Sequence, residues 1–259
     1  MTSRPKALVT GASSGIGTAL ARRLSAADHD LVLVARRRDR LEELARDLPT
    51  DVEVLVADLG TRDGVDAVTA RVRTGDLRVV ISNAGVGGYA PLAEVDPHEV
   101  DRLWTLNSIA PIAIARAALP SLIAAGEGGV ITVGSLLAFS SGLGNDRLPA
   151  RTLYAGAKAA TVAFTRALAG ELMGTGVTAT VVCPGLVATE WQGGMNQGNP
   201  NAMSAADVAA AAWTAFTRGE VLCVPGLEDA AAVDRFAEAE AALLFGGNRA
   251  PLAERYRAS

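Results

Sequence analysis

The sequence predicts an α/β protein with one doubly wound parallel sheet of about seven strands and helices on both faces. Three observations predict this fold. Short runs rich in Val, Ile and Leu recur along the 259 residues, the stretches between them have helical periodicity, and no linker divides the chain. Strands that are apolar on both faces are typical of a buried parallel sheet. Strands that alternate with helices form right-handed crossovers, which gives the doubly wound arrangement.

The predicted strands are spaced so that a helix fits between successive ones. They are residues 6–10, 30–35, 51–57, 78–82, 129–135, 177–183 and 221–225. After the first strand, Leu20 and Leu24 lie four residues apart. After the second, Leu41, Leu44 and Leu48 recur at helical steps between charged residues. These spacings predict amphipathic helices that cover the sheet.

Two long segments interrupt the alternation, at 138–152 and 190–204. Both follow the carboxyl ends of predicted strands, where open α/β sheets bind ligands. Loops of this length inside a compact unit are usually functional or mobile. Ser204, with Asp207 three residues later, predicts the start of a helix directly after the second segment.

The end of the chain, 227–259, predicts a helix that stops at Gly246 and Gly247, followed by a second short helix. We expect these C-terminal helices to form a lid, a subunit contact or a solvated surface. The stretch is too acidic for a convincing membrane anchor.

Composition and charge argue against several classes of function. The net charge is −4 and the pI is near 5.3, so no basic excess favours nucleic acid. Cys183 and Cys223 lie in apolar runs, which predicts buried reduced thiols, and no metal-binding spacing is present. The first residues contain no signal peptide pattern, and we find no uninterrupted apolar span long enough to cross a bilayer. We therefore expect a cytoplasmic protein without membrane association.

The stretch TGASSGIG, residues 10–17, follows the first predicted strand and opens a helix. Glycines let the backbone approach a phosphate closely, and the helix amino terminus supplies oriented N–H donors. The spacing is neither a Walker loop nor Gly-x-Gly-x-x-Gly. A tight structural turn is the alternative. In the first strand-to-helix connection of an alternating chain, the stretch indicates a Rossmann-type dinucleotide-binding domain, which we assign to residues 1–259.

Tyr154 and Lys158 form a second motif. Lysine is scarce here, since Lys6 and Lys158 are the only two among 24 basic residues. Positions i and i+4 share a helix face, so phenol and ammonium would project together. A solvated helix pair is the alternative interpretation.

Together these motifs resemble those of the classical short-chain dehydrogenase/reductase family. The glycine loop, Asn83-Ala84-Gly85 after the fourth strand and Pro184-Gly185 after the sixth occur in that family's order, over about residues 6–190. The residues that resemble its catalytic tetrad are Asn107, Ser135, Tyr154 and Lys158.

The resemblance implies an oxidoreductase that interconverts a ketone or aldehyde and an alcohol by hydride transfer. Tyr154 would be the general acid or base, with its pKa lowered from about 10 by the Lys158 ammonium and by an oxidised nicotinamide. Lys158 would also hold the nicotinamide ribose. Ser135 would donate a hydrogen bond to the substrate oxygen. Asn107 would hold a water near Lys158 and complete a proton relay; otherwise it is an ordinary polar helix residue.

The resemblance also assigns cofactor contacts and implies a homodimer or homotetramer. The contacts are Gly11, Ser13, Ser14, Gly15, Ile16, Gly17, Arg36, Asp58, Leu59, Asn83, Ala84, Gly85, Tyr154, Lys158, Pro184, Gly185, Val187 and Thr189. Asp58 would accept from the adenine amino group, or else cap the following helix. Val187 and Thr189 would hold the carboxamide.

The end of the second strand indicates which dinucleotide is used. NAD enzymes tend to carry an acid there for the 2′-hydroxyl. Here Ala35 is followed by Arg36-Arg37-Arg38. An arginine matches a 2′-phosphate, so we expect NADP(H), with Arg36 as the main contact and NAD(H) as the alternative.

The spacing departs from the family pattern between Ser135 and Tyr154, which are 154 − 135 = 19 residues apart. Either the loop at 138–152 carries an insertion, or Ser141 is the acting serine. We favour Ser135, because it ends a strand, and a loop holds a donor less well.

The two long segments, 138–152 and 190–204, also contain most of the residues that we expect to line the substrate pocket. We expect Asn145, Asp146 and Arg147 to shape the substrate pocket. Apolar side chains predicted to line the cleft are Tyr89, Phe139, Leu143, Trp191 and Met195. They suggest a hydrophobic or moderately bulky carbonyl substrate.

Two other functions fit this fold. A non-catalytic dinucleotide-binding regulator would keep the glycine loop while the tetrad decayed, but all four tetrad positions are filled. A lyase or epimerase would usually need a larger substrate domain than the roughly 70 residues after Thr189.

Overall fold

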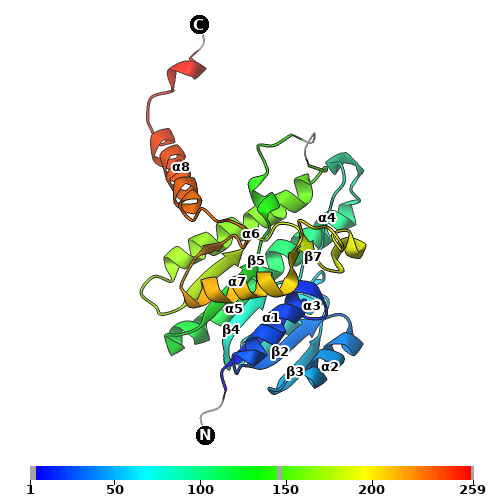
Figure 1. Ribbon diagram of the computed structural model, residues 1–259. Helices are drawn as coiled ribbons and strands as arrows, with labels where there is room; N and C mark the ends of the chain where they lie inside the picture. The colour runs from blue at the N-terminus through cyan, green and yellow to red at the C-terminus, as the bar shows by residue number, and fades with distance from the viewer. Residues whose placement is uncertain (1–3, 145–147, 258–259) are drawn as a thin grey trace. The chain divides into compact units, whose positions relative to one another are not determined.

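The computed structural model describes residues 4–144 and 148–257, and its centre is a seven-stranded parallel sheet (Figure 1). The strand order is β3-β2-β1-β4-β5-β6-β9. The bounds are Lys6–Thr10 for β1, Asp30–Ala35 for β2, Val52–Val56 for β3, Leu77–Ser82 for β4, Gly129–Val133 for β5, Thr178–Val182 for β6 and Leu222–Cys223 for β9. The predicted fold class and all seven predicted strands are confirmed.

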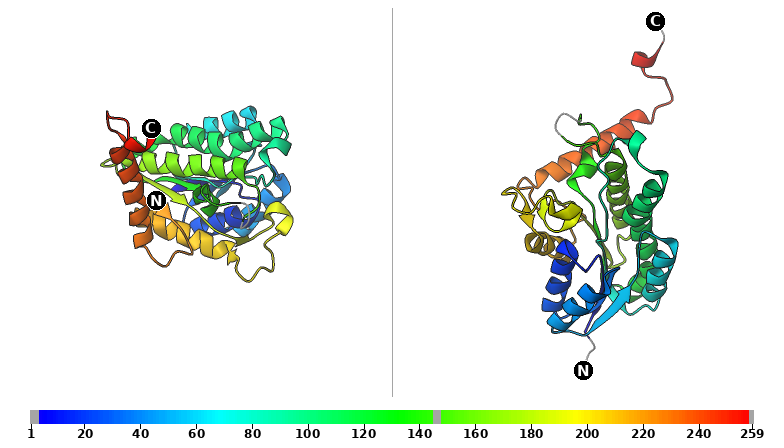
Figure 2. Two further views of the ribbon diagram at one scale, coloured as in Figure 1. Left: turned by 90° about the horizontal axis from the view of Figure 1, so that it is seen from above. Right: turned by 90° about the vertical axis from the view of Figure 1, so that its right-hand side faces the viewer.

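Helices cover both faces of the sheet, so the part of the chain up to Pro225 has three layers (Figure 2). One face carries α1, Gly15–Ala26, α2, Arg38–Asp47, and α7, Ala205–Thr217. The other carries α3, Arg62–Val72, α5, Ala110–Ala125, and α6, Thr152–Glu171.

Neighbouring strand residues enter different cores, which explains the unbroken apolar runs. Val9 and Leu33 are buried beneath α1 and α2, while Leu8 and Val32 are buried beneath the opposite helices. Because successive strand side chains point to opposite faces, both must be apolar when both faces are covered. Cys183 and Cys223 are buried free thiols, as predicted.

The strand order reverses between β1 and β4, and this crevice is where open α/β sheets bind ligands. Hydrogen bonds join the carboxyl ends of the two strands. Thr10 Oγ1 accepts from the backbone N–H groups of Asn83 at 2.9 Å and Ala84 at 3.0 Å. The Asn83 side chain in turn donates to the Thr10 carbonyl at 2.9 Å. The glycine loop and the segment after β4 are therefore held together.

A π-helical turn, Thr105–Ile109, joins α4, Pro97–Trp104, to α5. By length and composition the helical stretch Pro97–Ala125, which contains an 18-residue window with a mean hydropathy of 1.6, could cross a membrane. Charged residues, including Glu99, Asp101 and Arg116, interrupt this stretch, so it is not the uninterrupted apolar span that the sequence prediction excludes. Ile114 and Leu122 of α5 are fully buried against the sheet, which is the position of a core helix.

Short elements shape the two long segments. The first begins with the 3₁₀ turn η3, Leu136–Phe139. The second lies between β7, Val187–Ala188, and β8, Met203–Ser204, which pair in parallel, and contains η4, Trp191–Gly194. Ser204 caps α7 by accepting from the Asp207 N–H at 3.0 Å, as predicted.

By their internal contacts the residues form two compact units, Met1–Pro225 and Gly226–Ser259. The second unit contains α8, Ala231–Gly247, and the 3₁₀ turn η5, Glu254–Tyr256. The predicted C-terminal helix and the short helix after it are confirmed.

Candidate active site

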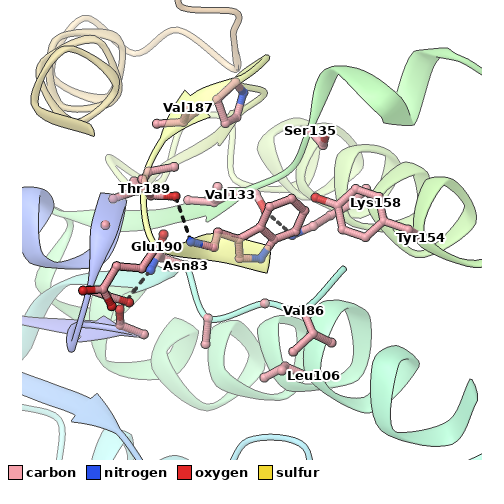
Figure 3. A pocket seen from close by; sticks show the side chains of 18 of the residues that line it. Asn83, Val86, Leu106, Val133, Ser135, Tyr154, Lys158, Val187, Thr189 and Glu190 are labelled. Carbon is pink, nitrogen blue, oxygen red and sulfur yellow. Dashed lines mark hydrogen bonds between the residues drawn. The ribbon is translucent and has the colours of Figure 1, made fainter. Parts of the chain in front are cut away.

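A cavity of about 750 Å³ opens at the carboxyl ends of the parallel strands (Figure 3). Its walls come from the glycine loop, the ends of β2 to β6, the start of α6 and the segment that follows β6. All predicted catalytic and cofactor residues line it except Gly17 and Asn107. The structure therefore brings together residues that lie as far apart in the chain as Gly11 and Thr189.

The glycine loop forms one wall of the cavity. Gly11 and Gly15 have φ angles of 67° and 55°, in the left-handed region that favours glycine. Gly17 lies behind the loop, where a Cβ would come within 2.1 Å of the Gly11 carbonyl oxygen. The side chain of Ser14, the N-cap of α1, makes no capping hydrogen bond. An N-terminus of this kind suits an anionic ligand.

Tyr154 and Lys158 project from the first turns of α6, and both are buried. The Lys158 Nζ lies 5.9 Å from the centroid of the Tyr154 ring and donates to the Val133 carbonyl at 2.8 Å. Ser135 follows β5 and forms a side-chain hydrogen bond with Tyr154. Its hydroxyl also accepts from the Leu137 N–H at 3.1 Å, which caps η3.

Burial controls the protonation of this pair. It raises the pKa of the Tyr154 phenol well above its usual range, and the nearby Tyr89 raises it further, while the Ser135 hydrogen bond offsets part of the rise. Burial also lowers the pKa of Lys158 to about 8. The protein alone therefore does not lower the pKa of Tyr154, in contrast with the sequence expectation for Lys158.

Asn107 lies in the π-helical turn, behind the cavity wall. Its carboxamide accepts from the Val86 N–H at 3.0 Å and donates to the Val86 carbonyl at 2.8 Å. A Cβ on Gly85 would come within 2.9 Å of Asn107 Oδ1 and 3.4 Å of Lys158 Nζ. These polar atoms thus converge on Gly85. That Asn107 holds a water there stays a prediction.

The alternative serine, Ser141, is exposed and is not among the cavity residues, whereas Ser135 is. Its neighbour Ser140 is buried and accepts from Arg151 Nε at 2.7 Å. The buried Arg151 also donates to the carbonyls of Ser140 and Leu143.

Sequence reasoning missed Arg151 because arginine is common in this chain, and its place three residues before Tyr154 is the only signal. Asn145, Asp146 and Arg147 lie outside the described residues, but Leu148 and Pro149 line the cavity.

A family model described as short chain dehydrogenase matches residues 5–200. The chain belongs to the short-chain dehydrogenase family. A curated relative, the 1-deoxy-11-beta-hydroxypentalenate dehydrogenase of Streptomyces exfoliatus, is 36% identical over 222 residues, which cover 81% of this chain and 78% of the relative.

Two solved dehydrogenases share the fold over nearly the whole chain. One from Sphingobium yanoikuyae, in complex with NADPH, is 31% identical with a TM-score of 0.89 and covers 97% of this chain and 100% of its own. The bulky-bulky ketone specific alcohol dehydrogenase of Comamonas testosteroni is 29% identical with a TM-score of 0.87, covering 98% and 99%.

Three charged groups of this short-chain dehydrogenase gather where β2 ends. Arg36 Nη1 lies 3.7 Å from the Asp58 carboxylate. Arg37 donates to the Ser13 hydroxyl at 3.0 Å and to the Ser13 carbonyl at 3.1 Å. Asp58 Oδ1 also accepts from the Gly60 N–H at 2.9 Å, while Thr61 caps α3. Of the three arginines after Ala35, only Arg36 was predicted to contact the cofactor, and Arg37 had no predicted role.

Aromatic rings surround the Tyr154 phenol. The ring centroids of Tyr89 and Trp191 lie 5.4 Å and 5.7 Å from that of Tyr154, and 6.0 Å from each other. Tyr89, Trp191 and Met195 line the cavity, as predicted. The prediction is wrong for Phe139, which packs against a buried cluster behind the wall, and for Leu143, which is exposed.

Proposed function

We propose that this short-chain dehydrogenase interconverts an uncharged ketone or aldehyde and the corresponding alcohol, with NADP(H) as the hydride carrier. One observation carries the proposal. Ser135, Tyr154 and Lys158 meet at one region of a cavity whose other walls are the glycine loop and the arginines after β2. Hydride transfer needs these two regions to share a single cavity.

The residues present fit a dinucleotide. The left-handed Gly11 and Gly15 leave room for a phosphate beside the backbone, and the uncapped N-terminus of α1 offers N–H donors. Arg36 and Arg37 supply positive charge where a 2′-phosphate is read, and Ala35 leaves no carboxylate there for a 2′-hydroxyl. NADPH bound to the Sphingobium yanoikuyae relative supports the same choice.

When bound, the reduced cofactor supplies the hydride. Tyr154 donates its proton to the substrate oxygen as negative charge develops there, and Ser135 donates a hydrogen bond to the same oxygen. The Lys158 ammonium then lies close to the phenolate left on Tyr154 and stabilises it. Burial raises the pKa of Tyr154, so the phenol is in the protonated form that can donate to a carbonyl oxygen.

Charges within the cavity indicate the substrate class. Among the described residues that line it, those with a formal charge are Arg36, Arg37, Asp58, Lys158 and Glu190. All but Lys158 contact one another or Ser13, away from Tyr154. Beside Tyr154 the walls are aromatic, from Tyr89 and Trp191. This favours a carbonyl with bulky apolar substituents, and the Comamonas testosteroni relative, a bulky-bulky ketone specific enzyme, supports the same class.

Consumption of NADPH with a panel of bulky uncharged ketones and aldehydes tests the proposal, with 2-keto acids as the matched charged set. We expect turnover of the uncharged set, and deuterium from 4-deuterated NADPH on the carbinol carbon of the product. Binding of NADPH without turnover of any carbonyl would favour the non-catalytic regulator instead.

A further inference from the structure

Glu190 places a negative charge beside the arginines that are proposed to bind the negatively charged cofactor. It lines the cavity directly after Thr189, on the far side of the pocket from Tyr154 and Lys158 (Figure 3). Its carboxylate accepts from Arg40 Nη1 at 2.6 Å and lies 3.5 Å from Arg37 Nη1. These ion pairs join the segment after β6 to the start of α2, across 150 residues of sequence.

Arg37 contacts both the glycine loop and Glu190. It holds Ser13 of the glycine loop through Nε and Nη2, while Nη1 faces Glu190. Arg37 is also the N-cap of α2, directly after β2, where the 2′ substituent of a dinucleotide is read. A carboxylate and a 2′-phosphate would therefore use the same guanidinium.

We propose that Glu190 is a specificity-determining residue that competes with the cofactor 2′-phosphate for Arg37. The inference rests on the proposed function, because it requires a dinucleotide in this cavity. The phosphate carries more negative charge than a carboxylate and three acceptor oxygens. Glu190 and Arg40 are about half exposed, and ion pairs of this exposure are weak, so the phosphate displaces the carboxylate.

Competition for Arg37 also affects the surroundings of Tyr154. Trp191, the next residue, packs on Tyr154 with 5.7 Å between ring centroids. Consecutive residues thus contact the arginines on one side of the cavity and the phenol on the other. Release of Glu190 by a 2′-phosphate changes the environment of Trp191, whereas a nucleotide without this phosphate leaves the Glu190 ion pairs in place.

Adenosine 2′,5′-bisphosphate and 5′-AMP are fragments of the cofactor that differ by the 2′-phosphate, so they test the competition without turnover. Calorimetry gives the dissociation constant of each. Glu190→Gln should tighten binding of the bisphosphate by about two- to fivefold, the range of a weak exposed ion pair, and leave 5′-AMP unchanged. Glu42→Gln is the matched control, since it removes the same charge from α2 where Glu42 faces Arg38. Because Glu42 is exposed and does not line the cavity, Glu42→Gln should change either dissociation constant by less than about twofold.

Tryptophan emission tests the link to Trp191. In a Trp104→Phe/Trp213→Phe background, the bisphosphate should shift the emission of Trp191 and 5′-AMP should not. The inference is overturned if Glu190→Gln binds the bisphosphate more weakly, or if the dissociation constants of both nucleotides change equally. It is also overturned if the Trp191 emission is the same with the bisphosphate as with 5′-AMP. If neither nucleotide binds the unaltered protein, the proposed function fails instead.

Discussion

The Lys158 ammonium lies 5.9 Å from the centre of the Tyr154 ring and donates its hydrogen bond to the Val133 carbonyl at 2.8 Å. This geometry fixes the position of the charge relative to the phenol. In the proposed reaction the ammonium stabilises the phenolate once the proton has left Tyr154, and burial keeps the phenol protonated beforehand. The arrangement therefore suits proton donation to a carbonyl oxygen.

Carbonyl reduction should slow as the pH rises through about 8. Burial lowers the pKa of Lys158 from its ordinary 10.5 to about 8, so the lysine is charged below this pH and neutral above it. The pKa of Tyr154 lies higher, so the phenol itself stays protonated in this range. The pH profile of kcat/KM for reduction should be level below about pH 8 and fall above it.

Lys158→Arg is the control for this assignment, because a guanidinium stays protonated throughout. Whatever its absolute rate, this variant should lack the fall near pH 8. A fall that persists in Lys158→Arg would assign the titration to another group.

Ser135 should be the serine that matters for turnover. It contacts the Tyr154 phenol, whereas Ser141 is exposed and outside the cavity. Ser135→Ala should reduce kcat by roughly 10²- to 10³-fold, the effect of losing one donor to a developing oxyanion. Ser141→Ala should stay within about twofold. The reverse ranking in steady-state kinetics would restore the alternative left open by the sequence.

Arg36 and Arg37 should select NADPH over NADH. Alanine at either position should weaken NADPH binding by roughly 10- to 100-fold, because each loses a hydrogen bond between charged groups, and leave NADH nearly unchanged. Arg38→Ala is the matched control, since this arginine pairs with Glu42 on the exposed face of α2. Equal catalytic efficiency with NADPH and NADH in the unaltered protein would show the NADP assignment to be wrong.

Gly17→Ala should damage the cofactor region and the fold together. Its Cβ would lie 2.1 Å from the Gly11 carbonyl oxygen, which is backbone and can move only if the glycine loop does. Thermal unfolding should begin at a lower temperature, and NADPH affinity should fall by at least about 100-fold. Gly170→Ala in α6 has open space around it and should be neutral or slightly stabilising. A Gly17→Ala protein that binds NADPH normally would contradict the role of this close approach.

Sequence periodicity and motif order predicted the sheet and the residues around the cavity, because both depend on local spacing. Tyr154 and Lys158 share a face of α6 wherever that helix lies. The direction of the Tyr154 pKa shift could not be predicted, because burial depends on rings from Tyr89 and Trp191, far away in the sequence.

Other features lacked a signal in the sequence. Phe139 and Leu143 are apolar, and apolar type alone does not distinguish a cleft wall from a core or an exposed loop. Arginine is frequent in this chain, so the sequence does not show that Arg37 and Arg151 differ from the others. Their tertiary contacts do, since Arg37 lies beside Glu190 and Arg151 donates to Ser140.

Single-turnover reduction by Tyr154→Phe tests the central claim most directly, with Tyr89→Phe as the matched control from the same aromatic cluster. Tyr154→Phe should bind NADPH like the unaltered protein and reduce the carbonyl about 10²- to 10⁴-fold more slowly, the range for loss of a general acid. Tyr89→Phe keeps its ring and should stay within about threefold. Reduction by Tyr154→Phe at the rate of the unaltered protein would contradict the account.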